Sequence, residues 1–244
     1  MCGRYTSVTS VAELAAYFGA DDVVADDLGP RYNVAPTDEV YAVVRAGGSR
    51  RLGTLRWGLV PPWAEDPKVG ARMINARAES LADKPAFRPA FGHRRCLLPA
   101  DGFYEWQHLD GATASGGGRG GGGASRPWYV RRPDGEPLAL AGVWERWRPR
   151  GSDGPPLVTA AVVTTSANER LAPLHDRMPV VLAPGAWDDW LDPANDDLDA
   201  LSSLLVPAPD HLLEALAVSS LVNRVANDGP ALVEPVPEPP AGEG

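Results

Sequence analysis

Cys2 has the most distinctive chemistry in this chain, because it directly follows the initiator methionine. Removal of Met1 leaves a first residue that carries both an α-amine and a thiol. An α-amine has a pKa of about 7.7–8.0, so a useful fraction is neutral and nucleophilic at physiological pH. The pair can form an imine with an aldehyde and close it to a thiazolidine, or the thiol can attack an amide with the amine as its base. A Met-Cys start that is incidental to function is the alternative.

The other cysteine, Cys96, lies in the apolar sequence Arg95-Cys-Leu-Leu98, which is typical of a buried structural thiol. Neither cysteine belongs to a Cys-x-x-Cys pair or to another cluster with the spacing of metal ligands. We therefore expect no zinc site. The sequence implies no other metal and no organic cofactor.

Two further residues could move protons. Glu105 lies among aromatic residues in Phe103-Tyr-Glu-Trp106, within a predicted strand. It is either a surface residue or an inward-facing acid, and in the second case desolvation would raise its pKa and suit it to shuttle protons. His175 precedes an aspartate and an arginine in a predicted loop. It is either an ordinary surface residue or a proton relay that works near neutral pH.

Several other side chains could bind parts of a nucleotide. Asn75 and Arg77 are two residues apart, so in a strand both would point the same way. Asn75 could then bond a sugar or the N-terminal amine, and Arg77 a phosphate. Arg4 is likewise two residues from Cys2 and could bring a phosphate to it. Trp63 follows two prolines, which suits either an exposed ring that stacks on a base or a ring packed at a sheet edge.

Charge is distributed unevenly along the 244 residues, whose formal net charge is −9. Residues 41–100 include eleven basic and four acidic residues, whereas residues 181–244 include one basic and twelve acidic residues. Surface charges are screened beyond about 8–10 Å, so the acidic end does not cancel the field of the basic segment. The composition is compatible with a nucleic-acid partner, and an ordinary solvated arginine face is the alternative.

The elements that must position these residues are mostly short strands. The chain has 26 glycines and 25 prolines, more than is usual in a helical bundle, so we predict a mainly β or α+β domain with a strongly curved sheet. Capping boxes at Ser10 and Ser166 predict two helix starts, with Gly19 ending the first helix. Gly47-Gly48 predicts a hairpin turn. Strands are predicted at residues 40–45, 51–60, 96–107, 128–132, 138–147, 157–165 and 180–182, and further helices at 187–191 and 198–205.

The chain reads as one domain, residues 1–233. Residues 111–125 are rich in glycine and are predicted to form a flexible insertion at a hairpin tip. Residues 234–244 are predicted to form a disordered, proline-rich tail. No apolar run approaches the roughly 18 residues that a membrane-spanning helix needs, and no secretory signal is visible. We therefore expect a cytoplasmic protein.

Six motifs occur in a fixed order along the chain, and together they resemble the SRAP family of abasic-site processing proteins. The resemblance extends from Cys2 to about residue 237, including Asn227-Asp-Gly-Pro230, and omits the glycine-rich insertion. The motifs are Met1-Cys-Gly-Arg-Tyr5, Arg31-Tyr-Asn-Val-Ala-Pro36, Arg56-Trp-Gly-Leu-Val-Pro61, Ile74-Asn-Ala-Arg-Ala-Glu79, Asp101-Gly-Phe-Tyr-Glu-Trp106 and His175-Asp-Arg-Met-Pro179.

The resemblance implies a single α+β domain with a barrel-like antiparallel sheet. It also implies covalent capture of abasic sites in single-stranded DNA through Cys2, after the protein has removed its own Met1. Catalytic roles are implied for Asn75, Glu105 and His175, the histidine assisting the opening of the sugar. DNA-binding roles are implied for Arg4, Asn33, Pro36, Trp63, Arg77 and Thr164.

Two other function classes compete with this interpretation. One is a hydrolase or peptidase that uses the N-terminal cysteine as its nucleophile and binds no nucleic acid. The other is a non-catalytic DNA- or protein-binding module in which Cys2 is incidental. We expect a monomer whose partner is single-stranded DNA rather than a membrane, nucleoid-associated when bound.

Overall fold

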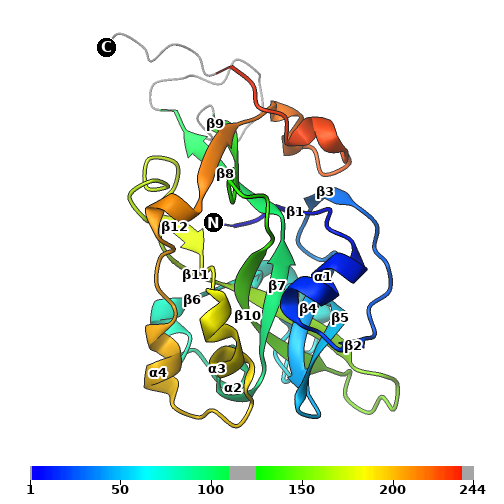
Figure 1. The fold of residues 1–244 in the computed structure, drawn as a ribbon. Coiled ribbons are helices and arrows are strands. Elements are labelled where there is room, and N and C mark those ends of the chain that lie inside the picture. The colour runs from blue at the N-terminus through cyan, green and yellow to red at the C-terminus, as the bar shows by residue number, and fades with distance from the viewer. Residues whose placement is uncertain (1, 110–124, 238–244) are drawn as a thin grey trace.

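Two β-sheets and a few short helices form one domain (Figure 1). The computed structural model describes residues 2–109 and 125–237. The predicted glycine-rich insertion lies almost entirely outside these residues. None of the described helices is long and apolar enough to cross a membrane. The α-helices are α1 (Val11–Phe18), α2 (Arg88–His93), α3 (Trp187–Leu191) and α4 (Leu198–Ser203).

The larger sheet curves until it meets itself. Its strands follow the order β12-β11-β10-β7-β4-β5-β2, and a further pairing of β5 with β11 closes five of them into a ring. The short strand β6 pairs with β11 beside this ring. The bounds are β2 (Asp22–Val23), β4 (Glu39–Ala46), β5 (Ser49–Trp57), β6 (Asn75–Arg77), β7 (Arg95–Ala100), β10 (Leu138–Trp147), β11 (Leu157–Ser166) and β12 (Arg177–Pro179).

This curvature confirms the predicted mainly β domain, but the sheet is mixed rather than purely antiparallel. The pairings β5–β11, β6–β11 and β2–β5 are parallel. A parallel pair needs a long connection, and the β5–β11 pair is connected through residues 58–156. No local pattern in the sequence announces such a pairing, because it joins segments about a hundred residues apart.

The second sheet has the order β13-β9-β8-β1-β3. Strands β8 and β9 pair antiparallel, with His108 opposite Ser125. The insertion predicted between them lies, apart from Ser125, outside the described residues. The single β-rich run predicted for residues 96–107 is two strands, because the chain passes at Asp101 from the ring into this sheet. The bounds are β1 (Tyr5–Ser7), β3 (Arg31–Val34), β8 (Gly102–His108), β9 (Ser125–Arg131) and β13 (Glu214–Ala217).

The first capping box is confirmed and the second is not. Ser10 and Glu13 cap each other at the start of α1, and Gly19 ends this helix in the left-handed conformation. Ser166 instead ends β11, and the following residues form turns in which Asn168 accepts from the Leu171 N–H. Six 3₁₀ segments complete the described structure: η1 (Pro67–Arg72), η2 (Ala78–Ser80), η3 (Pro184–Ala186), η4 (Asp210–Leu212), η5 (Ser220–Asn223) and η6 (Pro230–Leu232).

The domain extends beyond residue 233. Pro235 forms a bridge with Val218, and the Val236 N–H donates to the carbonyl of Ala217 at 2.8 Å. The predicted tail therefore does not begin at residue 234, because its first residues complete the edge of the second sheet. Residues 238–244 lie outside the described part of the chain.

The two faces of the ring contribute to different hydrophobic clusters. Residues of one face, including Tyr41, Val43 and Leu97, pack against the α-helices. Residues of the other face pack against β1 and β8, and we call this group, which contains Trp57, Cys96 and Val162, the Cys2 cluster, because Cys2 lies within it. Cys2, the candidate nucleophile, thus lies between the ring and the second sheet.

Candidate active site

The start of the chain is anchored at the middle of the molecule by β1, which pairs with β8 on one side and β3 on the other (Figure 1). Tyr5 lies opposite Phe103, and the Tyr104 N–H donates to the carbonyl of Arg4 at 2.9 Å. This register carries Cys2 toward the part of β8 that contains Glu105. Cys2 is completely buried.

Asn75 holds Cys2 by its backbone. Its Nδ2 donates to the Cys2 carbonyl oxygen at 2.8 Å. Asn75 lies opposite Val162 of β11, and the carbonyl of the preceding residue, Ile74, accepts both the Val162 N–H (3.0 Å) and the Trp57 indole N–H (2.9 Å). Asn75 therefore contacts Cys2 through its carbonyl, whereas the predicted bond to a sugar or to the amine stays a prediction. The strand that carries Asn75 is itself fixed from two sides.

Glu105 is the acid that faces inward, with 3% of its surface exposed. Burial raises the pKa of this carboxyl to about 7, and the neighbouring Asp176 carboxylate adds to the rise. The pKa of the Cys2 thiol is raised well above its usual value, first by burial and then by the charge of Glu105. The thiol is consequently protonated at neutral pH, and a group that can accept its proton lies within electrostatic reach.

His175 occupies the loop between β11 and β12. The Ala167 N–H donates to the Asp176 carbonyl at 2.9 Å, which closes this loop. His175 Nδ1 lies 2.9 Å from the Arg177 backbone nitrogen, which donates to it, and 2.8 Å from the Asp176 carboxylate, to which a protonated ring would donate. Burial lowers the pKa of His175, so the neutral ring, with its proton on Nε2, predominates at neutral pH.

Arg4 and Asn33 are brought together, but they bind the C-terminal segment. Arg4 Nη1 donates to Asn33 Oδ1 at 2.8 Å and to the Val222 carbonyl at 3.1 Å. Asn33 Nδ2 lies 2.9–3.2 Å from the carbonyls of Val222, Arg224 and Asn227. These contacts fasten the segment that follows β13 over β3, and the DNA contacts predicted for the two side chains stay predictions.

Pro36 and Trp63 lie on loops at the surface. Pro36 precedes Thr37, whose φ of 79° is unusual for a β-branched residue and marks a constrained turn. Asp38 stabilises this turn by accepting from the Ala35 N–H at 2.9 Å and pairing with Arg31. Trp63 is 51% exposed, which fits the predicted stacking ring better than the alternative of a packed one.

Arg77 and Thr164 are paired in register on β6 and β11, but they differ in accessibility. Arg77 is exposed, whereas Thr164 is buried. The Thr164 carbonyl accepts from Arg177 Nη2 at 2.7 Å, and Arg177 also forms a two-pronged ion pair with Glu79. Thr164 therefore contacts Arg177 in this structure, whereas Arg77 is exposed, and the DNA contacts predicted for Thr164 and Arg77 stay predictions.

Sequence reasoning missed four residues that hold the predicted site residues or their loops in place through hydrogen bonds and ion pairs: Trp57, Asp38, Glu79 and Arg177. Each of the four lies within or beside one of the six motifs. Membership in a motif could therefore have pointed to these residues, whereas their residue types alone did not. Within residues 2–109 and 125–237, no group of three or more His, Cys, Asp or Glu side chains is placed to hold a metal ion.

Comparison with known proteins agrees with the six motifs. The family model for SOS response associated peptidase (SRAP) matches residues 1–225. The chain is 41% identical over 235 residues to "Abasic site processing protein YoqW" of Bacillus subtilis, covering 96% of this chain and 99% of that protein. It is 30% identical over 244 residues to "Abasic site processing protein YedK" of Escherichia coli, covering 97% and 100%.

Solved structures show the same fold. A crystal structure of a Bacteroides thetaiotaomicron protein superimposes with a TM-score of 0.80 at 22% identity, covering 96% of this chain and all of the other. A Bordetella bronchiseptica protein gives a TM-score of 0.71 at 26% identity, covering 89% of this chain and all of the other. The ring of strands and its companion sheet are thus an established architecture.

Proposed function

Because the chain belongs to the SOS response associated peptidase (SRAP) family, we propose that it binds abasic sites in single-stranded DNA and captures them covalently through Cys2. The observation that carries this proposal is the burial of Cys2 near a carboxyl group, Glu105, whose pKa is raised to about 7. Such a group can both give and take a proton at neutral pH. Relatives named abasic site processing proteins support the choice of substrate.

The reaction begins with the removal of Met1, in which water splits the Met1–Cys2 peptide bond and frees the Cys2 amine. His175 then assists opening of the abasic deoxyribose, which exposes its aldehyde. The amine adds to the aldehyde carbon, and water leaves as Glu105 supplies a proton, giving the imine. Finally the thiol adds across the C=N bond, so that sulfur bonds to carbon and the thiol proton passes to nitrogen. The product is a thiazolidine.

The cross-link protects the lesion, because an imine left open would invite β-elimination and breakage of the DNA strand. Asn75 orients Cys2 by its carbonyl, and the exposed Arg77 and Trp63 supply a phosphate contact and a stacking surface for the strand. Glu105 also serves as the proton-transfer group for the loss of Met1 and for reversal of the adduct. We place this activity in the cytoplasm.

Intact-mass measurement after mixing the protein with an abasic oligonucleotide tests the proposal. The expected spectrum shows loss of Met1 and addition of the oligonucleotide, and Cys2→Ala abolishes the addition. A variant with an uncleavable residue before Cys2 also fails to cross-link, since its amine is no longer at Cys2. Full cross-linking by that extended protein would refute the mechanism.

The same measurement separates the two rival functions. A hydrolase that uses the Cys2 thiol on small amides would cleave an amide substrate and leave abasic DNA without added mass. A binding module in which Cys2 is incidental would retain every activity in Cys2→Ala. A gel shift with undamaged single-stranded DNA that weakens as salt rises supports the nucleic-acid function against the hydrolase.

A further inference from the structure

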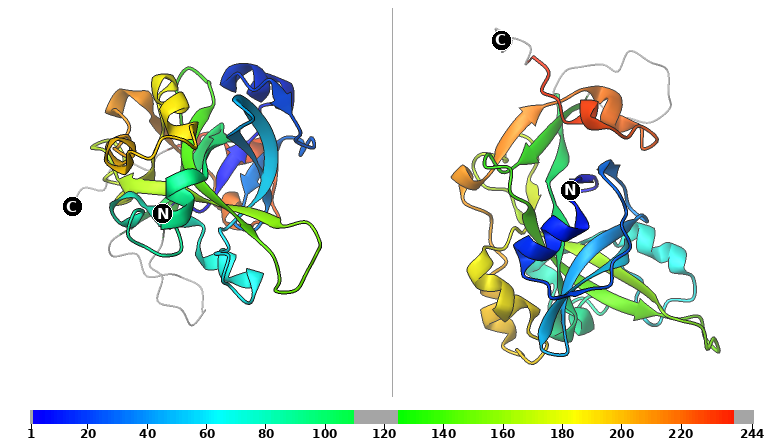
Figure 2. Two further views of the ribbon diagram at one scale, coloured as in Figure 1. Left: turned by 90° about the horizontal axis from the view of Figure 1, so that it is seen from below. Right: turned by 45° about the vertical axis from the view of Figure 1, so that its right-hand side comes forward.

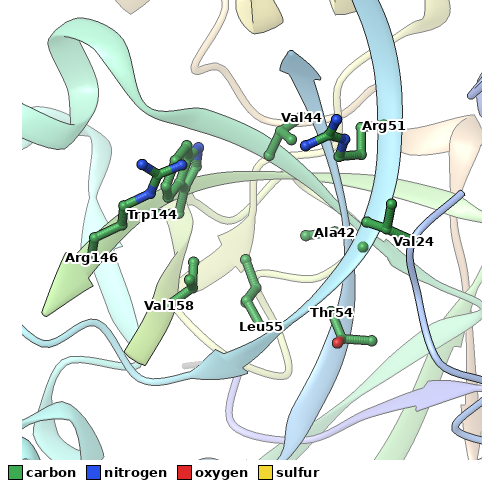
Figure 3. A pocket seen from close by; sticks show the side chains of 10 residues that line it. Val24, Ala42, Val44, Arg51, Thr54, Leu55, Trp144, Arg146 and Val158 are labelled. Atoms are coloured by element: carbon green, nitrogen blue, oxygen red, sulfur yellow. The ribbon is translucent and has the colours of Figure 1, made fainter. Parts of the chain in front are cut away.

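A hollow lies at the edge of the Cys2 cluster, away from Glu105 and His175. Its cavity volume is about 220 Å³, and it is lined by residues of β4, β5, β10 and β11, with Val24 beside them (Figure 3). Its lining includes Ala42 and Leu55 of the Cys2 cluster. Pockets for drug-sized ligands measure roughly 300–1,000 Å³, so this hollow fits one planar ring rather than a larger molecule.

Trp144 and Arg146 form one wall of the hollow. The Arg146 guanidinium lies over the Trp144 ring, 5.3 Å from its centroid (Figure 3). Arg146 and Arg148 are exposed, and within the described residues neither takes part in an ion pair. Glu145, which lies between Trp144 and Arg146 in the sequence, is buried and already forms an ion pair with Arg94 at 2.6 Å. The two guanidinium groups therefore keep their charge available in a chain that is acidic overall.

The hollow is connected to the loop that carries Trp63. The Trp147 indole donates to the Ala64 carbonyl at 2.7 Å, which ties the β10–β11 hairpin to this loop. Pro62, Arg146, Arg148 and Pro156 line a second hollow between them. Both views of Figure 2 show this hairpin projecting from the body of the molecule. We call Trp63, Pro62, Arg148, Arg146 and Trp144 the hairpin strip.

Strand β11 connects the first hollow, which Trp144 and Arg146 of the hairpin strip line, with the site. Val158, which lines the first hollow, and Val162, which lies opposite Asn75, are four residues apart on β11. At about 3.3 Å per residue they are separated by roughly 13 Å. A ligand bound along the hairpin strip could therefore be continuous with one bound at Cys2.

We propose that the hairpin strip binds the single-stranded DNA that flanks the abasic site, with phosphates on Arg146 and Arg148 and one base ring in the hollow beside Trp144. Unpaired cations interleaved with aromatic rings are the chemistry that single strands require, since bases stack while arginines follow the backbone. An apolar partner would leave the two guanidinium groups desolvated and unpaired. This inference rests on the proposed function and extends its DNA contact beyond the reactive nucleotide.

The test compares abasic oligonucleotides of about 4 and about 16 nucleotides, the range of sizes known for single-strand sites. Binding is measured by fluorescence anisotropy over a salt series with the Cys2→Ala protein, so that cross-linking does not intervene. Adding Arg146→Ala with Arg148→Ala should weaken binding of the long strand several-fold. It should also reduce the slope of log K against log salt by about 1.4, because each lost phosphate contact accounts for about 0.7. Binding of the short strand should not change.

A matched control neutralises two exposed cations elsewhere, Lys84→Ala with Arg88→Ala, and should leave both strands bound as before. If the hairpin variant behaves like this control, or if it weakens both strands equally, the proposal is overturned. Arg148→Glu provides a second reading, since charge reversal should weaken the long strand further. Wild-type cross-linking of the short abasic strand is the separate test of the proposed function. If the wild-type protein does not cross-link the short abasic strand, the proposed function is refuted. If it does, and the hairpin variant binds the long strand as the wild type does, only this inference is refuted.

Discussion

Asn75 Nδ2 and the carbonyl oxygen of Cys2 are 2.8 Å apart, and this hydrogen bond holds Cys2 by a group that takes no part in the proposed chemistry. The amine and the thiol are thus positioned without being bonded by Asn75. The carbonyl lies on a completely buried residue, so its hydrogen bond is worth more than one at the surface.

Asn75→Ala should therefore slow cross-linking. Removing a partner from a buried polar group costs about 1–3 kcal/mol, which corresponds to roughly a 5- to 150-fold fall in rate if Cys2 loses its position. Single-turnover gel kinetics measure this. Asn75→Asp, which keeps the shape and cannot donate, should be impaired as well. A normal rate in both variants would show that Cys2 is positioned by β1 alone.

Trp57 should act on the reaction through Asn75, because its indole fixes the carbonyl of Ile74. Trp57→Phe keeps an aromatic ring against Tyr5, whose centroid is 5.2 Å away, and loses the indole hydrogen bond together with part of the ring volume. We expect slower cross-linking at unchanged DNA affinity and a stability loss of about 1 kcal/mol. Trp187→Phe is the matched control, since it loses an equivalent indole bond to the Leu182 carbonyl far from Cys2. Equal cross-linking rates in the two variants would contradict the prediction.

Glu105 should make the protein less stable as pH rises. Its pKa is about 7 in the folded chain against 4.5 for an unperturbed carboxyl, so the folded state binds more protons between these values. Glu105→Gln removes this effect. The free energy of unfolding of the variant should rise relative to that of the wild type between pH 4.5 and pH 7. Above pH 7 the difference should reach the order of 3 kcal/mol. Urea unfolding at pH 4 and pH 8 measures the difference, and a constant difference at both values would contradict the raised pKa.

Cross-linking should show the same titration. The wild-type rate should change its pH dependence near pH 7, where Glu105 passes from donor to acceptor. Glu105→Gln should be slow, and its profile should lack that inflection. The wild-type and Glu105→Gln proteins should both have Met1 removed before the assay, so that this removal does not limit the cross-linking rate. An inflection near pH 7 that persists in Glu105→Gln would assign it to another group.

Arg95 should matter for stability alone. It is 3% exposed and donates to five backbone carbonyls, those of Phe91, Gly92, Trp190, Asp192 and Asn195, at the ends of α2 and α3. Arg95→Leu leaves these acceptors without a donor and should cost at least about 3 kcal/mol in urea unfolding. Arg88→Leu, which changes an exposed arginine on the neighbouring helix α2, is the control. A loss below 1 kcal/mol, as at ordinary surface sites, would mean that water replaces the guanidinium.

The sequence determined features that depend on neighbours along the chain. Ser10, Glu13 and Gly19 set both ends of α1, and Gly47-Gly48 set the β4–β5 turn, because capping and turn formation need only a few consecutive residues. The sequence also allowed the candidate reactive residues to be identified. Cys2 was recognised by its position in the chain, and Glu105 by the aromatic residues beside it.

Contacts between distant segments were decided only by the tertiary structure. The parallel β5–β11 pair that closes the ring joins Arg56 to Thr159, and Asn33 is bound by carbonyls about 190 residues away. Burial of Glu105 likewise sums over strands that no local window contains, so the direction of its pKa shift could be anticipated and its size could not. Short-range hydrogen bonding is written in consecutive residues, whereas desolvation and partner choice depend on which remote parts of the chain meet.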